Sequence, residues 1–371
     1  MNSKTTLTKT KILGKEYQFP IYLPDATLGV VRGLDSKTVA KTGINGVVIN
    51  TYHLMTNPGT EVLDQVGGIK KFMNWNGLTA SDSGGFQLFS LLHKNPKLGK
   101  ITDDGVVLYS GEKQQKKILF TPEDSIRIQF SIQSDIMICL DDFSPIDASA
   151  KRLRESIDRT VAWAKRCKAE FTKQCHQLGY NDENRPLLIG VVQGHNNHEL
   201  RKECAQKLEA IGFDGYGLGG WPFKADGSFD YDMCQITADV TPNNKIRFAL
   251  GIGSPENIVR LYQMGYNIFD CVLPTRDARH QRLYTFTKNP TTIDFNRAEN
   301  WYDYLYIGRG SFKQDIQPID QYCDCHTCQN YSRSYLNHLF KVKDNLAFHL
   351  ATIHNLRFYA KLMELLKNLS V

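Results

Sequence analysis

The stretch from Leu187 to Gly220 reads LLIGVVQGHNNHELRKECAQKLEAIGFDGYGLGG, and it decides the fold class. Its apolar run Leu187 to Val192 predicts a buried strand, and the segment His198 to Ile211 has the apolar spacing that is typical of a helix. A second short run, Asp214 to Leu218, predicts another strand. A strand, a helix and a strand in this order indicate two neighbouring strands of a parallel sheet.

The same alternation extends over most of the chain. Further helical segments are expected at Ala150 to Phe171 and at Pro255 to Met264. About eight strand–helix units would close into a (β/α)8 TIM barrel, and an open doubly wound sheet is the alternative, because periodicity cannot by itself close a sheet. We expect the barrel. The other candidate strands are Gly46 to Asn50, Leu78 to Ser81, Asp135 to Leu140, Ile246 to Leu250 and Tyr266 to Phe269.

Polar residues and glycines lie just past the ends of the candidate strands, and this position favours the barrel. In barrel enzymes the active site is built from the carboxyl ends of the strands. The glycines would let backbone approach a flat ligand closely, although each could equally serve a turn. The residues in these positions are Asp82, Asp141, Gln193, Gly220, Gly251 and Asp270.

Two of these acids lie in stretches that suggest chemistry. Asp270 ends an apolar run and is followed by Arg276 and Arg279. Arginine presents a planar charged fork that suits phosphate oxygens, so an acid beside two arginines suggests a phosphate-bearing substrate. A surface cluster of salt bridges is the alternative explanation. Asp82 follows a second apolar run and precedes two glycines and an aromatic residue.

Together these stretches resemble the tRNA-guanine transglycosylases. The resemblance implies a glycosyltransferase in which an aspartate attacks the ribose of the anticodon wobble guanosine and guanine leaves from a covalent aspartyl-ribose intermediate. A 7-deazaguanine base, either the prequeuosine base or queuine, then takes its place, as part of queuosine modification of tRNA. The strings that carry the resemblance span nearly the whole chain: Asn50–Leu54, Lys71–Gly77, Thr79–Gln87, Leu119–Glu123, Val192–Gly194, Phe269–His280 and a cysteine cluster near the C-terminus.

The resemblance also implies roles for individual residues. Asp270 matches the nucleophile and Asp82 the general acid/base, which requires that Asp82 can be protonated while Asp270 remains ionised. Arg276 and Arg279 match residues that hold the anticodon loop. The residues that match the base-binding set are Asp141, Gln193 and Gly220 for hydrogen bonds, and Phe86 and Leu250 for the two faces of the ring.

One segment departs from the family pattern. After Gly220 the chain continues Trp221-Pro222-Phe223-Lys224-Ala225, where the family has a small or aliphatic run that ends in glutamate. That glutamate receives the aminomethyl cation of the prequeuosine base, and Ala225 occupies its place. We therefore expect weaker use of that base, unless Asp142, Lys224 or a shifted loop restores the contact. Smaller departures are Leu250 for methionine, and His195 and Gln281 for glycine.

The chain has nine cysteines, of which only Cys323, Cys325 and Cys328 cluster. Three thiolates so close together are typical of a structural zinc site, and an odd total argues against a disulfide framework. A fourth ligand is needed, and helical periodicity does not choose between His349 and His354. The family pattern implies His354, because its ligand histidine lies in the same Ile-His-Asn-Leu string.

The composition suits a globular protein of 371 residues, with 41% hydrophobic residues and a formal net charge of +6. The positive excess lies mainly in residues 271–371 and suits an RNA partner, although a solvated surface of mixed charge is the commoner explanation. Met1 to Phe19 contains no signal-peptide core, and no apolar stretch is long enough to cross a bilayer. We therefore expect a cytoplasmic location without membrane association.

We expect residues 1–293 to form the catalytic barrel, and residues 294–371 to form a zinc-binding subdomain and a C-terminal helix packed on it. The resemblance implies a homodimer that binds tRNA and a 7-deazaguanine base, with one structural zinc per chain. The alternatives are a non-catalytic tRNA-binding partner subunit, which the presence of both acids argues against, and a transglycosylase with a different base or nucleic-acid target. The archaeal type of such an enzyme carries further RNA-binding domains, which are not expected here.

Overall fold

The computed structural model describes residues 7–110, 116–145, 147–224, 226–297 and 300–369. Its centre is a sheet of eight parallel strands in the order β3-β13-β12-β11-β10-β9-β5-β4. The two end strands also meet, because the N–H of Ala26 donates to the carbonyl of Val48 at 2.7 Å. The sheet is thus closed, which confirms the (β/α)8 barrel and excludes the open sheet. The strands are β3 (Ile21–Pro24), β4 (Gly46–Ile49), β5 (Leu78–Ser81), β9 (Ile136–Ile138), β10 (Leu187–Val192), β11 (Gly215–Leu218), β12 (Ile246–Ala249) and β13 (Ile268–Cys271).

Alternate side chains of the strands fill the barrel. Ile21 and Leu23 belong to the same buried cluster as Ile189 and Val191 from the far side of the sheet, as expected when successive residues of a strand point to opposite faces. Glycine provides room where strands come close, since a Cβ on Gly46 would lie 2.4 Å from Cδ2 of Leu23. The interior is therefore a packed core and not a pore.

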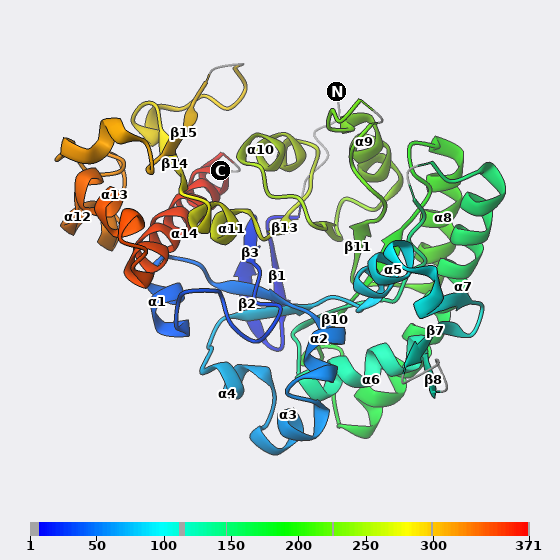
Figure 1. The fold of residues 1–371 in the computed structure, drawn as a ribbon. Coiled ribbons are helices and arrows are strands. Elements are labelled where there is room, and N and C mark those ends of the chain that lie inside the picture. The colour runs from blue at the N-terminus through cyan, green and yellow to red at the C-terminus, as the bar shows by residue number, and fades with distance from the viewer. Residues whose placement is uncertain (1–6, 111–115, 146, 225, 298–299, 370–371) are drawn as a thin grey trace.

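Helices cover the outside of the barrel (Figure 1). Helix α8 (His198–Ile211) has the predicted bounds, and it begins where the side chain of Asn197 accepts a hydrogen bond from the N–H of Leu200. Helix α7 (Ala150–Gln177) extends beyond its predicted end, and α10 (Pro255–Gln263) ends close to it. The other helices are α1 (Ser36–Lys41), α2 (Thr51–Thr56), α3 (Thr60–Val66), α4 (Ile69–Met73), α5 (Gly85–Lys94), α6 (Pro122–Ile132), α9 (Tyr231–Val240), α11 (Leu273–Arg279), α12 (His326–Asn330), α13 (Arg333–Lys341) and α14 (Asn345–Asn368).

The sequence did not predict strand β3 or two antiparallel additions to the barrel. The first addition is a hairpin of β1 (Lys9–Ile12) and β2 (Lys15–Gln18), whose buried residues Ile12 and Tyr17 join the barrel core. Because the hairpin directly precedes β3, it closes the amino end of the barrel. The second addition lies between α5 and α6 and consists of β6 (Gly99–Thr102), β7 (Gly105–Ser110) and β8 (Lys116–Phe120).

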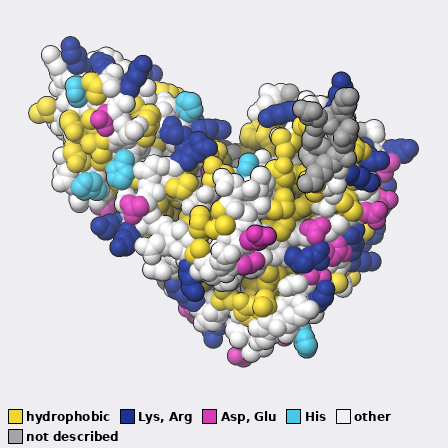
Figure 2. Space-filling model, turned by 60° about the horizontal axis from the view of Figure 1, so that its bottom comes forward, with side chains coloured by type: hydrophobic (Ala, Val, Ile, Leu, Met, Phe, Trp, Pro, Cys, Tyr) yellow, Lys and Arg dark blue, Asp and Glu magenta, His cyan; other side chains and the backbone are white. Residues whose placement is uncertain are grey.

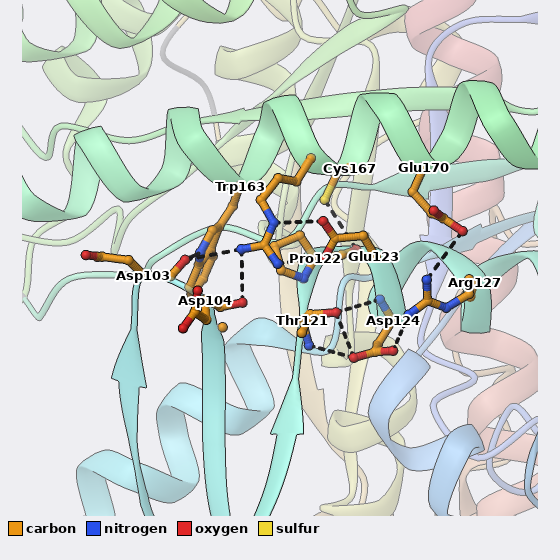
Figure 3. Close-up of polar contacts among 12 residues, drawn as sticks. Asp103, Asp104, Thr121, Pro122, Glu123, Asp124, Arg127, Trp163, Cys167 and Glu170 are labelled. Atoms are coloured by element: carbon orange, nitrogen blue, oxygen red, sulfur yellow. Dashed lines mark hydrogen bonds and ion pairs between the residues drawn. The ribbon is translucent and has the colours of Figure 1, made fainter.

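Helix α7 holds the second addition in place (Figure 3). Nε1 of Trp163 donates to the carbonyl of Asp103 at 2.7 Å. The guanidinium of Arg166 forms two hydrogen bonds with the carboxylate of Glu123, each of 2.7 Å. Glu123 lies in the first turn of α6, so these contacts join the addition, α6 and α7 into one unit.

The C-terminal part of the chain packs on the barrel. Strands β14 (Arg282–Phe286) and β15 (Tyr302–Tyr306) pair antiparallel across residue 293, and the expected domain boundary there stays a prediction. Helix α14 contacts β3, α1, α10 and α11, so it covers the barrel between its first and last units. In Figure 2 the region of α12 and α13 stands out as a lobe, with Lys and Arg side chains gathered at the notch beside it. None of the helices in the described ranges combines the length and apolarity needed to span a membrane.

Candidate active site

A cavity of about 520 Å³ opens at the carboxyl ends of the barrel strands. Gln193 is fully buried and does not line it, and Arg279 lines a smaller pocket beside it. The structure therefore brings together most of the residues that the sequence assigned to one site, although they are far apart along the chain. The assigned residues that line the cavity are Asp82, Phe86, Asp141, Gly220, Leu250, Asp270 and Arg276.

The direction of the two central carboxylates follows from the two-residue period of the strands. Leu78 and Ala80 of β5 belong to the barrel core, so Asp82, two residues further on, shares their inward direction. In β13 the same holds for Ile268 and Asp270. Both acids thus lie in the layer directly above the apolar core.

Asp82 receives hydrogen bonds from three groups. Its carboxylate accepts from the N–H groups of Thr51 and Gly84, both at 3.0 Å, and from Nδ2 of Asn50 at 2.5 Å. Burial nevertheless raises the pKa of Asp82 to about 6, because these bonds only partly offset the loss of water. Asp82 can therefore exchange a proton near neutral pH. The sequence suggested no role for Asn50, although it lies in a family string.

Asp270 is less well stabilised as an anion. Its carboxylate accepts a hydrogen bond from the N–H of Gly251 at 2.9 Å. Burial raises the pKa of Asp270 to about 7, and the charges of Asp82 and Asp25 add to this effect. The roles implied by the resemblance require that Asp82 can be protonated while Asp270 remains ionised, and in the structure burial raises both pKa values, that of Asp270 further. The reason is that Asp82 accepts more hydrogen bonds than Asp270.

Asp141 and Gln193 form a second polar group. Nε2 of Gln193 donates to Oδ2 of Asp141 at 2.6 Å, and burial raises the pKa of Asp141 to about 6. Within the described part of the chain, Oε1 of Gln193 is buried without a hydrogen-bond partner, and it lies towards Gly220, where an added Cβ would be 3.7 Å away. Gly220 lines the cavity with a φ of +94°, a backbone conformation that favours glycine.

Arg201 fixes the backbone that carries these residues. It is fully buried, and its guanidinium donates to the carbonyls of His195, Val192 at 3.1 Å and Gly219 at 2.8 Å. These bonds tie the end of β10 to the end of β11. Sequence reasoning missed Arg201, and the available signal was a charged residue on the apolar face of the predicted helix His198 to Ile211.

Apolar side chains border the carboxylates. Phe86 on α5 is 47% exposed and packs edge-on against Phe143, with ring centroids 5.4 Å apart. Leu250 follows β12, and Gly217 leaves room for it, since a Cβ there would lie 2.8 Å from Cδ1 of Leu250. The cavity therefore offers the apolar surfaces on which a flat ring can stack.

Arginines make one side of the site basic. Arg276 on α11 is exposed at the cavity, whereas Arg279 shares a pocket of about 210 Å³ with Arg32. Burial and the neighbouring charge of Arg32 lower the pKa of Arg279. One terminal nitrogen of Arg279 is buried and unpaired among the described residues. This side of the site therefore suits an anionic ligand.

Trp221, Pro222 and Phe223 line the cavity, and Ala225 lies outside the described residues. Trp221 is 45% exposed, and its ring centroid lies 5.6 Å from that of Phe223. The wall that follows Gly220 is therefore aromatic, as the sequence suggested.

Two residues that could have replaced the missing glutamate have other partners. Nζ of Lys224 pairs with Asp232 at 3.1 Å. Asp142 is buried, and its carboxylate binds the guanidinium of Arg152 at 2.6 and 2.8 Å and that of Arg159 at 2.5 Å. A cation could recruit Asp142 only by leaving these arginines unpaired.

A group of sulfur and nitrogen atoms away from the cavity could hold a metal ion. The ligand atoms of Cys323, Cys325, Cys328 and His354 all lie within 4.8 Å of one another. Nδ1 of His354 lies 3.2 Å from Sγ of Cys328, and its Nε2 donates to the carbonyl of Tyr284 at 2.6 Å. That bond leaves Nδ1 free as a ligand, and three thiolates with one imidazole fit zinc.

Comparison with known proteins decides which family has this site. A family model described as queuine tRNA-ribosyltransferase matches residues 3–369. The chain belongs to the queuine tRNA-ribosyltransferase family. A queuine tRNA-ribosyltransferase of Caldanaerobacter subterraneus subsp. tengcongensis is 38% identical over 93% of this chain and 84% of its own length. That of Pseudoalteromonas translucida is 39% identical over 94% and 85%, respectively.

Membership of the queuine tRNA-ribosyltransferase family confirms the resemblance seen in the sequence. It also confirms the enzyme class, a tRNA-guanine transglycosylase that belongs to queuosine modification of tRNA.

One further acid in the cavity escaped sequence reasoning. Asp25 follows β3, and the available signal was the apolar run Ile21 to Pro24 directly before it.

The cluster of Cys323, Cys325, Cys328 and His354, called the metal group below, yields a test with a control on the same helix. His354→Ala and Cys325→Ser should lose bound zinc and lower the thermal stability, because metal binding contributes to folding. His349→Ala should keep about one zinc per chain, since Nδ1 of His349 bonds to the carbonyl of Gly33 at 2.9 Å. Metal analysis by mass spectrometry measures this. Zinc lost from His349→Ala and kept by His354→Ala would show that the histidine was wrongly chosen.

Proposed function

We propose that the enzyme exchanges the wobble guanine in a tRNA anticodon for a 7-deazaguanine base through a covalent aspartyl-ribose intermediate. The observation that carries the proposal is the pair of carboxylates, Asp82 and Asp270, which line one cavity. Two acids in different environments suit the nucleophilic and acid–base roles on a glycosidic bond. Their presence together also favours a catalytic subunit over a non-catalytic partner.

Asp270 is the proposed nucleophile. A carboxylate oxygen bonds to C1′ of the ribose while the bond from C1′ to N9 of guanine breaks, and an ester joins the enzyme to the RNA. N9 of the incoming base then attacks C1′, and the carboxylate leaves. Attack requires ionised Asp270, whereas the leaving guanine requires a proton from Asp82, so the rate should peak between their pKa values of about 6 and about 7 and fall on either side.

Asp82 is the proposed general acid/base. Guanine must gain a proton as it leaves, and the incoming base must lose one, so the same group donates first and accepts afterwards. A carboxyl group with a pKa of about 6 is suited to both steps near neutral pH. The hydrogen bond from Asn50 holds this carboxyl group in position.

The proposed base site lies between Phe86 and Leu250. The carboxylate of Asp141 accepts from the ring N–H and exocyclic amine of guanine, and the amide of Gln193 makes a further bond. The N–H of Gly220 donates to the ring carbonyl. The buried Oε1 of Gln193, unpartnered among the described residues, supports a ligand donor at this point.

Arg276 and Arg279 are proposed to hold the anticodon loop, and the Lys and Arg side chains gathered at the notch in Figure 2 support an RNA partner. A homodimer is proposed as well. The apolar side chains of Val30 and Phe72 are exposed and line one pocket of about 230 Å³. A second subunit would cover this apolar surface, which supports the dimer.

Zinc is the proposed metal, held by Cys323, Cys325, Cys328 and His354. When bound, it would have four protein ligands and no open position, so its role is structural. The hydrogen bond from His354 to Tyr284 would tie it to β14.

For the incoming base, we propose queuine or another 7-substituted deazaguanine in preference to the prequeuosine base. An aminomethyl cation beside Trp221 and Phe223 would face an apolar wall. Asp142 is already paired with two arginines, and Lys224 carries the same sign of charge as the ligand.

Replacement of the nucleophile tests the covalent step. Asp270→Ala should abolish guanine exchange and the denaturant-resistant adduct with tRNA, because no ester can form. Incorporation of labelled guanine and gel mobility of the adduct measure the two effects. Asp182→Ala, which removes an exposed carboxylate outside the cavity, should retain both. Normal exchange by Asp270→Ala would rule out its role.

Asp82→Asn tests acid–base catalysis. The amide keeps the size of the side chain but cannot transfer a proton, so base exchange should slow by at least about a hundredfold while tRNA still binds. Single-turnover rates and binding titrations separate the two. Wild-type turnover would remove Asp82 from the mechanism.

The aromatic wall predicts a difference between bases. In measurements of kcat/KM on one tRNA, the prequeuosine base should be used less efficiently relative to guanine than in relatives that keep the glutamate. Ala225→Glu should raise kcat/KM for the prequeuosine base, because it supplies a counter-charge. It should leave kcat/KM for guanine unchanged, which provides the internal control. A wild-type enzyme that already favours the prequeuosine base and is unaffected by Ala225→Glu would show that this segment does not set specificity.

A further inference from the structure

Asp25 is a third carboxylate at the centre of the cavity. It follows β3 directly, and its parity is that of the inward-facing residues Ile21 and Leu23. In the sheet register Leu23 lies beside Asp270, so Asp25 is one step above the nucleophile on the neighbouring strand. A backbone bridge to Val48 holds Asp25 at the closure of the barrel.

One oxygen of this carboxylate is occupied and the other is available. Oδ1 of Asp25 accepts from the N–H of Thr27 at 3.1 Å and from the Thr27 hydroxyl. For Oδ2 the described residues provide no hydrogen bond. The Thr27 contacts fix the carboxylate, so Oδ2 is a preorganised acceptor in the wall of the cavity.

The charges around Asp25 favour the sugar and the phosphate of a nucleotide at different positions. Asp25, Asp82 and Asp270 line the catalytic cavity and would repel a phosphate, whereas they accept hydrogen bonds from neutral hydroxyl groups. Arg279 and Arg32 line the smaller pocket, to which Asp25 also contributes. A sugar is therefore favoured at Asp25, with the backbone phosphate towards the arginines.

We propose that Asp25 accepts a hydrogen bond from the 2′-hydroxyl of the exchanged nucleotide, so that the enzyme selects ribose over deoxyribose there. The inference rests on the proposed function, because attack by Asp270 on C1′ brings that sugar beside Asp25. Within a polynucleotide the 3′ and 5′ oxygens are esterified, and the 2′-hydroxyl is the one ribose donor left. This group also distinguishes RNA from DNA at a given position.

The test uses two anticodon stem-loop RNAs that differ only in the 2′-hydroxyl or 2′-hydrogen of the exchanged guanosine. Wild-type enzyme should incorporate labelled guanine into the ribose form with kcat/KM at least about tenfold higher, the size expected for a hydrogen bond to a charged acceptor. Asp25→Ala should lose about tenfold on the ribose form and change little on the deoxy form. Asp158→Ala, an exposed carboxylate on α7, is the control and should keep the wild-type preference.

If Asp25→Ala does not fold, Asp25→Asn replaces it, and its weaker acceptor should also reduce the preference. Equal use of both RNAs by the wild type, or an equal loss on both RNAs in the variant, overturns the inference. If the pH profile of the Asp25 variant shifts while its preference for ribose stays unchanged, Asp25 acts through its charge on the other acids. That result would also overturn the inference. Absence of exchange on either RNA by the wild type would instead contradict the proposed function.

Discussion

The closure of the eight-stranded sheet is the constraint on which the rest of the structure depends. The bond from Ala26 to Val48 joins the ends of the sheet, and every strand then has one inward face. A slip of one residue in β5 or β13 would turn Asp82 or Asp270 away from the cavity. The apolar layers below the cavity therefore do more than stabilise the fold, since they set the direction of each side chain in the layer above.

Among the described residues, the buried acid Asp142 outside the cavity has arginine partners, whereas Asp82 and Asp270 within it have none. Asp142 is neutralised by Arg152 and Arg159, as expected of a buried charge that serves structure. Asp82 and Asp270 have hydrogen bonds but no such pairing in the described parts of the chain, and their pKa values rise towards neutrality. Such unpaired acids reduce stability, and their concentration in one cavity is typical of an active site.

Helix α14 links the metal group to the basic side of the site. His354 bonds to the carbonyl of Tyr284, and the next residue, Asn355, donates to the carbonyls of Pro274 and Arg282, both at 3.0 Å. Pro274 belongs to α11, the helix that carries Arg276 and Arg279. The C-terminal part therefore supports the geometry of the arginines, although none of its described residues lines the cavity.

Much of the fold and site could be predicted from local patterns in the sequence. The spacing of apolar residues predicted seven of the barrel strands and the bounds of α8, because both depend on which face of a segment is buried. The position of Asp82, Asp141 and Asp270 after strands placed them at one end of the barrel. Resemblance to a family then supplied their roles, which no pattern of apolar residues carries.

Other features needed contacts between distant residues. Strand β3 pairs with β13, and Asp25 bridges to Val48 of β4, so only contacts between residues far apart in the chain place Asp25 in the site. Periodicity placed His349 and His354 near the same helix face, and only the packing of α14 directs one to the cysteines and the other to Gly33. The pKa values of Asp82 and Asp270 also lay beyond the sequence, since they depend on burial and hydrogen bonds that the tertiary structure creates. The sequence by itself thus determined the elements, the family and the chemical groups, whereas the tertiary structure decided which groups meet and how strongly they are charged, because desolvation and pairing arise from residues far apart in the chain.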